Sequence, residues 1–201
     1  MSRRTADEFS RALSALLCAE GIAALTIGEI AARLQCSRRR LYDLAPTKEA
    51  LFARVCRQAL AGNLAKGYAA AERETDPAKA IAAYLMASLN ASGLSSVALK
   101  DLDSFEEGRQ TFDDYQVERM RGLERMLEAG IRDGVLASHH PRVLSEALIG
   151  AAFRLRNPKL LDETGLRVGD AFAEFYGIVL HGLLRDGSGA ASSVSPQAAP
   201  C

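Results

Sequence analysis

Hydrophobic residues recur every three or four positions along most of this chain, the spacing that places them on one face of an α-helix. A capping box formed by Thr5 and Glu8 precedes the first such segment, and Gly21 follows it. The apolar face between them consists of Phe9, Leu13, Leu16 and Leu17. The pattern predicts a first helix of about four turns.

Two shorter helices are predicted next, joined by a tight turn. Thr26 and Glu29 form a second capping box, and an apolar stripe follows it. The turn falls at Gln35-Cys36, and Ser37 is the predicted cap of the third helix. That helix begins with three consecutive arginines, Arg38 to Arg40.

The remaining pattern is helical as well. Pro46 and Thr47 introduce a fourth helix that extends to about Ala71. Further helical patterns cover 77–92, 104–134, 142–156 and 167–186, the second of them opened by a Ser104/Glu107 capping box and broken near Gly108. No alternating pattern typical of strands occurs, so we expect an all-α protein. Residues 187–201 carry little apolar bulk and are predicted to be a disordered tail.

Charge divides the chain into two parts. The 201 residues carry no formal net charge, but residues 1–57 contain 10 basic and 6 acidic residues, and the remainder contains 15 and 19. A basic N-terminal part suits a nucleic-acid partner, although the neutral total alone argues against one. We predict one domain over 1–57 and a second helical domain over 58–186.

The arginines at the start of the third helix need an explanation, because a helix N-terminus already carries positive partial charge and disfavours cations. Asp43 lies within one turn of Arg39 and Arg40 and is suited to pair with one of them, which would make the run an ordinary solvated surface. It cannot neutralise all three. We therefore expect a polyanion outside the helix to compensate, and DNA is the favoured candidate.

Composition argues against several other functions. The four cysteines have no CxxC spacing, and His139-His140 lacks a positioned carboxylate or thiol, so no metal or cofactor is predicted. No acid, base and nucleophile converge, so we predict no enzyme. A redox role for Cys36 is the alternative to packing in the turn. No apolar run is long enough to cross a membrane, and the free cysteines favour a cytoplasmic location.

The N-terminal pattern resembles the DNA-binding domain of the tetracycline-repressor (TetR) family over residues 6 to about 57. The resemblance rests on the long first helix, Gly21, Thr26, the I-A-A-R-L segment, Ser37, Leu41-Tyr42 and Thr47-Lys48-Glu49-x-Leu51. It implies a three-helix helix-turn-helix domain followed by a helical domain that dimerises and binds a small effector. The implied function is that of a homodimeric repressor, released from double-stranded operator DNA by that effector.

The resemblance also implies roles for individual residues. Thr26, Tyr42 and Lys48 correspond to phosphate contacts, Ser37 caps the recognition helix, and Arg38, Arg39 and Arg40 face the major groove. The chain departs from the family at Gln35, where glycine is frequent, and at Leu44 and Ala45. We expect Leu44 to fill the space beside Ala45. These departures leave open an alternative, a helical protein-interaction module that has lost DNA binding.

The second domain offers two further sets of candidates. Aromatic and methionine side chains on its apolar stripes are candidates for an effector pocket, although core packing explains each equally well. These are Tyr84, Met86, Leu89, Phe105, Phe112, Tyr115, Met120 and Phe153. By resemblance, the last two helices would form a dimer interface that includes Leu144, Leu148, Ala151, Phe172, Phe175, Tyr176, Val179 and Leu183.

Overall fold

Each of the first four helices begins at the side chain predicted to cap it. The hydroxyls of Thr5, Thr26, Ser37 and Thr47 accept hydrogen bonds from backbone N–H groups three residues later, at 3.0–3.2 Å. The helices are α1 (Ala6–Glu20), α2 (Ile27–Arg33), α3 (Arg38–Tyr42) and α4 (Lys48–Ala71).

The computed structural model describes residues 5–89, 93–155 and 157–183. The predicted tail, 187–201, lies outside this range. The side chains of three candidates named above also lie outside the described ones, namely those of Leu89, Phe153 and Leu183.

Six more helices follow in the described residues: α5 (Pro77–Leu89), α6 (Ser96–Asp103), α7 (Glu106–Arg132), α8 (Pro141–Arg154), α9 (Pro158–Thr164) and α10 (Val168–Leu183). Within the described ranges there is no strand, which confirms the all-α prediction. The sequence pattern missed α6 and α9. None of the described helices is both long and apolar enough to span a membrane.

The prediction for the start of α7 was wrong. Ser104 does not cap α7 but ends α6, where its hydroxyl donates to the Asp101 carbonyl at 2.6 Å. α7 instead begins after Phe105, without a side-chain cap, and continues unbroken through Gly108. A side chain at Gly108 would collide with the Leu102 carbonyl, so glycine is required by the close approach of α6 and α7 and does not break the helix.

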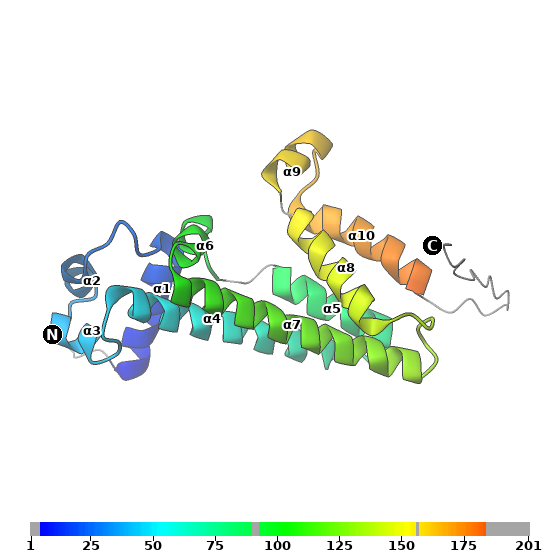
Figure 1. Ribbon diagram of the computed structural model, residues 1–201, viewed down its shortest axis with the longest axis horizontal. Helices are drawn as coiled ribbons and strands as arrows, with labels where there is room; N and C mark the ends of the chain where they lie inside the picture. Colours follow the sequence, from blue (N-terminus) through cyan, green and yellow to red (C-terminus); the bar gives the residue numbers. More distant parts are fainter. Residues whose placement is uncertain (1–4, 90–92, 156, 184–201) are drawn as a thin grey trace, which may run out of the picture.

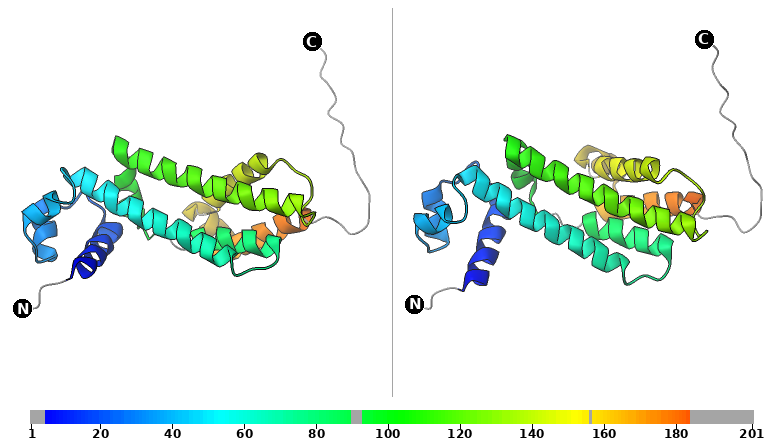
Figure 2. Two further views of the ribbon diagram at one scale, coloured as in Figure 1. Left: turned by 90° about the horizontal axis from the view of Figure 1, so that it is seen from below. Right: turned by 60° about the horizontal axis from the view of Figure 1, so that its bottom comes forward.

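The helices form an elongated molecule in which α4 and α7 lie side by side along the long axis (Figure 1). α1, α2 and α3 lie at one end, whereas α8 and α10 lie beside α5 and α7 toward the other end (Figure 2). α4 runs without interruption across residue 57. The predicted domain boundary therefore falls inside a continuous helix that links the two ends.

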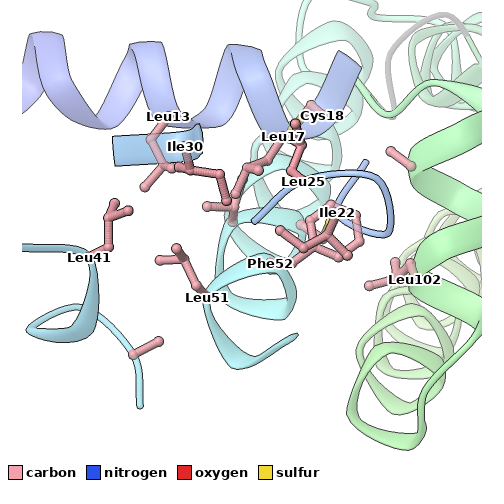
Figure 3. Packing of buried hydrophobic residues seen from close by; sticks show 14 of the residues in the cluster. Leu13, Leu17, Cys18, Ile22, Leu25, Ile30, Leu41, Leu51, Phe52 and Leu102 are labelled. Carbon is pink, nitrogen blue, oxygen red and sulfur yellow. The ribbon is translucent and has the colours of Figure 1, made fainter. Parts of the chain in front are cut away.

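Two hydrophobic clusters hold these helices together. The first joins α1, α2, α3 and the first half of α4, and Figure 3 shows Leu17, Ile30, Leu41 and Leu51 converging in it. Each of these four side chains is almost fully buried and stabilises the fold by about 1.5–3 kcal/mol. Leu102 of α6 also belongs to this cluster, which therefore extends across the predicted domain boundary.

The second cluster joins the end of α4 to α5, α7, α8 and α10. It contains Tyr84, Leu123, Leu127, Leu148 and Phe172 among its buried residues. The inner face of α7 thus contributes Tyr115 to the first cluster and Leu123 to the second.

Candidate nucleic-acid interface and ligand pocket

The α2–turn–α3 unit is fixed by its caps and by the conformation of its turn. Gln35 has φ +51°, which makes it the one non-glycine residue with positive φ in the described chain. The N–H of Cys36 then donates to the Ala31 carbonyl at 2.9 Å. Glycine adopts this conformation more easily, so the departure at Gln35 retains the turn at some conformational cost.

The side chains of the three arginines of α3 lie in different surroundings. Arg38 is exposed and lies over α2, where a Cβ added at Gly28 would be 3.0 Å from its Nη2. Arg40 is half-buried, and its guanidinium carbon lies 3.9 Å from the centre of the Phe9 ring. Arg39 is exposed, and its guanidinium makes no hydrogen bond or ion pair with the described residues.

The alternative, in which Asp43 pairs with one of the arginines, does not occur in the described part of the chain. No ion pair there joins Asp43 to Arg38, Arg39 or Arg40. Among the described residues, the three cations at the N-terminus of α3 therefore have no carboxylate partner. The side chains of Arg38 and Arg39 are exposed, whereas that of Arg40 lies on the Phe9 ring.

The predicted phosphate contacts differ in availability. Tyr42 is 51% exposed. Thr26 is also exposed, but its hydroxyl already donates to Glu29 Oε2 at 2.8 Å. The amide and hydroxyl of Thr26 lower the pKa of the Glu29 carboxyl, so this capping box carries a negative charge at neutral pH.

Lys48 has a structural role that the sequence did not indicate. Its Nζ donates to the carbonyls of Ile22 and Leu25, at 3.1 Å each. An ammonium has three donors, so one remains for an external anion. Lys48 thus attaches the start of α4 to the α1–α2 loop.

The same loop is held from α6. Asp101 Oδ2 accepts hydrogen bonds from the N–H groups of Ile22 and Ala23, and the Ser95 N–H donates to the Cys18 carbonyl at 2.8 Å. The loop that precedes α2 is therefore hydrogen-bonded to both α4 and α6. The sequence pattern missed this link because it missed α6.

The departures at positions 44 and 45 are explained by packing. Ala45 is buried in the first cluster and Leu44 packs against it, as expected from the sequence. Cys36 packs there too, and burial raises the pKa of its thiol. A thiol that stays protonated is a poor nucleophile, so the structure does not favour a redox role.

The candidates for an effector pocket do not gather in one place. Tyr84 is buried in the second cluster and Tyr115 in the first, whereas Phe105 packs against Phe52. Met86 packs against the second cluster and Met120 is half-buried. Phe112 alone among them lines a pocket of about 420 Å³ between α6 and α7, together with Leu99, Leu102, Asp103, Arg109 and Asp113.

The candidates for the dimer interface differ in how far they are buried. Leu148, Phe172 and Tyr176 are buried within the protomer, because α8 and α10 use these side chains to pack on α5 and α7. Leu144, Ala151, Phe175 and Val179 are half-buried. Among the described side chains of these two helices, the large apolar ones that are exposed are instead Val143 and Ile178, at 65% and 75% exposure, which the sequence did not single out.

Residues 11–55 match the family model described as bacterial regulatory proteins, tetR family. A comparison with curated proteins gave no match. The fold also matches those of many solved structures, and three of them are similar over most of both chains.

A putative transcriptional regulator from Saccharomonospora viridis, solved with choline, has a TM-score of 0.69 and 14% identity, over 88% of this chain and 96% of that one. The fatty acid degradation regulator FadR from Bacillus halodurans has a TM-score of 0.70 and 14% identity, over 89% and 100%. AibR, solved with isovaleryl coenzyme A and operator DNA, has a TM-score of 0.60 and 17% identity, over 85% and 97%. At these identities the likeness shows the fold.

Proposed function

We propose that this member of the tetR family of bacterial regulatory proteins is a homodimeric cytoplasmic repressor that a small-molecule effector releases from its operator. The observation that carries the proposal is the unneutralised positive charge at the start of α3, centred on Arg39. An exposed, unpaired guanidinium at the N-terminal end of a recognition helix is suited to read a base edge.

The three arginines would then have different roles. Arg39 reads guanine O6 and N7, a bidentate contact that discriminates by about 1–3 kcal/mol. Arg40 reaches the groove only by leaving the Phe9 ring, so it contributes less than Arg39. Arg38 stays near the start of α2, where its charge lies close to the DNA backbone.

The remaining predicted residues bind the DNA backbone or fix the helices that approach it. Tyr42 donates its exposed hydroxyl to a phosphate, and the third donor of Lys48 adds a charge near the start of α4. Ser37 fixes the start of α3 as its cap, and Thr26 fixes that of α2. These contacts position the recognition helix and carry no sequence information themselves.

A dimer is needed because one five-residue helix reads few bases. Two recognition helices about 34 Å apart would enter successive major grooves. Val143 on α8 and Ile178 on α10 are exposed apolar side chains, and we assign both to the dimer interface.

The regulatory step uses the contacts between α6 and the α1–α2 loop. An effector bound beside α6 would shift Asp101, and with it the loop that sets the position of α2 and α3. Tilting α4 at the same time changes the spacing of the two recognition helices. A typical coupling of about 1–3 kcal/mol would weaken operator binding ~5–150-fold. The choline and coenzyme A ester found with the two solved relatives support a ligand in this type of fold.

The test is fluorescence anisotropy with labelled double-stranded DNA from the region beside the protein's own gene. We expect binding that weakens steeply with salt, and a loss of at least about tenfold in affinity for Arg39→Ala. Arg132→Ala removes an exposed charge, paired with Asp133, from the far end of α7 and is the control. Absence of salt-sensitive binding, or equal effects of the two variants, would contradict the proposal and favour a protein-interaction module.

A further inference from the structure

A buried arginine lies in the middle of α7. Arg119 is only 4% exposed, and its Nε and Nη2 atoms are buried without a hydrogen-bond partner. Guanidinium groups remain charged in proteins, and an unpaired buried charge is strongly unfavourable. Such a group is expected to have an anionic partner when the protein functions.

The two free nitrogens lie on the same edge of the guanidinium. Their N–H bonds run parallel, which is the geometry that binds both oxygens of a carboxylate at once. One guanidinium carries a single positive charge, so it is neutralised by one carboxylate. A dianionic phosphate would require a second cation.

The protein offers Arg119 no carboxylate of its own in the described residues, where no ion pair includes it. The residues outside the described ranges contain one acidic side chain, Asp186, besides the terminal carboxylate. The counter-charge therefore comes from a ligand unless this C-terminal segment supplies it, and the test below separates the two.

Arg119 lies beside residues of the second hydrophobic cluster. The Tyr84 hydroxyl donates to the Arg119 carbonyl at 2.9 Å, and Leu123 lies one turn further along α7. Burial raises the pKa of the Tyr84 phenol, and the nearby Arg119 charge offsets part of that rise. Gln116, one turn before Arg119, has a buried Oε1 that also lacks a partner. Two polar groups with unused hydrogen-bonding capacity thus lie together between the two hydrophobic clusters.

These groups lie in line with the pocket between α6 and α7. Phe112, Gln116 and Arg119 follow one another at helical spacing on one stripe of α7, and Phe112 lines the pocket. Seven residues of helix separate Phe112 from Arg119, which corresponds to about 10 Å. Leu99 and Leu102 of α6 form the apolar wall opposite Phe112. The stripe therefore leads from the Arg119 charge to a pocket whose wall is apolar at Leu99, Leu102 and Phe112 and charged at Asp103, Arg109 and Asp113.

We propose that the effector is a carboxylic acid whose carboxylate binds Arg119 and whose apolar chain lies along α7 in the pocket between α6 and α7. This inference rests on the proposed function, because it names the ligand class for the regulatory step. The apolar chain contacts Leu102, the neighbour of Asp101, so binding acts directly on the helix that holds the α1–α2 loop.

The test uses octanoate as the probe, with octanol and octyl phosphate for comparison, in calorimetric titrations of the full chain. We expect octanoate to bind more tightly than either comparison compound. Arg119→Met should weaken octanoate binding roughly 10–100-fold, the range for a lost charge-assisted bidentate contact. Arg121→Met removes an exposed charge from the same helix and should leave binding unchanged.

Folding is checked separately. Without ligand, Arg119→Met should melt at the same temperature as the wild type or higher, because the change removes an unpaired buried charge. Melting at a lower temperature that Asp186→Asn reproduces would identify an internal counter-charge and overturn the proposal. Equal octanoate binding by wild type and Arg119→Met, no octanoate binding by the wild type, or tighter binding of octyl phosphate would also overturn it.

The operator assay distinguishes this inference from the proposed function. Arg119→Met should bind DNA like the wild type but should no longer be released by octanoate. Octanoate binding that depends on Arg119 in a protein without operator affinity would retain the ligand site and refute the repressor role.

Discussion

One carboxylate oxygen of Asp101 accepts hydrogen bonds from the backbone N–H groups of Ile22 and Ala23, at 2.7 and 2.8 Å. The accepting residue is on α6 and the donors precede α2, 79 and 78 positions away in sequence. A side chain of the predicted second domain thus completes the backbone hydrogen bonding of the first.

Removing that acceptor should destabilise the protein. Asp101→Ala leaves two N–H groups without a partner, at a cost of about 2–4 kcal/mol in the free energy of unfolding. Asp101→Asn keeps an acceptor oxygen for these bonds. Its cost should therefore be smaller than that of Asp101→Ala, by about 1 kcal/mol for each hydrogen bond that is retained. Urea unfolding of both variants measures the difference. Equal losses would show that the charge, and not the hydrogen bonds, holds the loop.

The turn before α3 should become more stable with glycine at position 35. Gln35 adopts φ +51°, which costs an ordinary residue roughly 1–2 kcal/mol, while glycine gains flexibility in the unfolded chain. We expect Gln35→Gly to raise the free energy of unfolding by up to about 1 kcal/mol. Gln58→Gly, in the middle of α4, should lower it by a similar amount. A decrease for both variants would contradict the assigned turn conformation.

Alkaline pH should destabilise the fold through Cys56. Burial raises the pKa of its thiol from 9.0 to about 12, so the folded protein keeps this proton where the unfolded chain loses it. The thiol therefore favours folding below about pH 9, and this contribution is lost progressively as pH rises toward 12. Comparing urea unfolding of wild type and Cys56→Ala isolates the effect. Their difference in stability should shrink by up to about 1.4 kcal/mol per pH unit above pH 9, and a constant difference would refute it.

The assigned dimer interface can be tested with one charge. Ile178 is 75% exposed on α10, and Ile178→Glu would place a carboxylate between the two protomers. We expect this variant to be monomeric in sedimentation experiments at concentrations where the wild type is dimeric. Val117→Glu, on an exposed part of α7, is the control and should remain dimeric. If the Ile178→Glu variant is dimeric, the interface does not include Ile178.

The sequence predicted the first four helices well because local signals specify them. Thr5, Thr26, Ser37 and Thr47 cap their helices through bonds that span three residues. α6 was missed because it is short, and Ser104, which ends it, resembles the first residue of a capping box. Its place is decided by contacts with distant residues, which no local pattern shows.

The candidate site was predictable in position but not in detail. The three arginines were identified by their charge, whereas their directions depend on Phe9 of α1 and Gly28 of α2. Arg119 was missed because a charged residue within a long helix normally indicates a solvent-facing side. Its burial follows from packing against α5, which periodicity alone does not reveal.

The close approach at Gly108 has a consequence for motion. Because backbone meets backbone there, α6 and α7 are pinned together at the C-terminal end of α6. A ligand bound between the two helices can therefore separate them only at the N-terminal end of α6, where the Ser95 N–H donates to the Cys18 carbonyl. That amide should therefore exchange its hydrogen faster when the pocket fills, while the amides of α6 near Leu102 keep their protection.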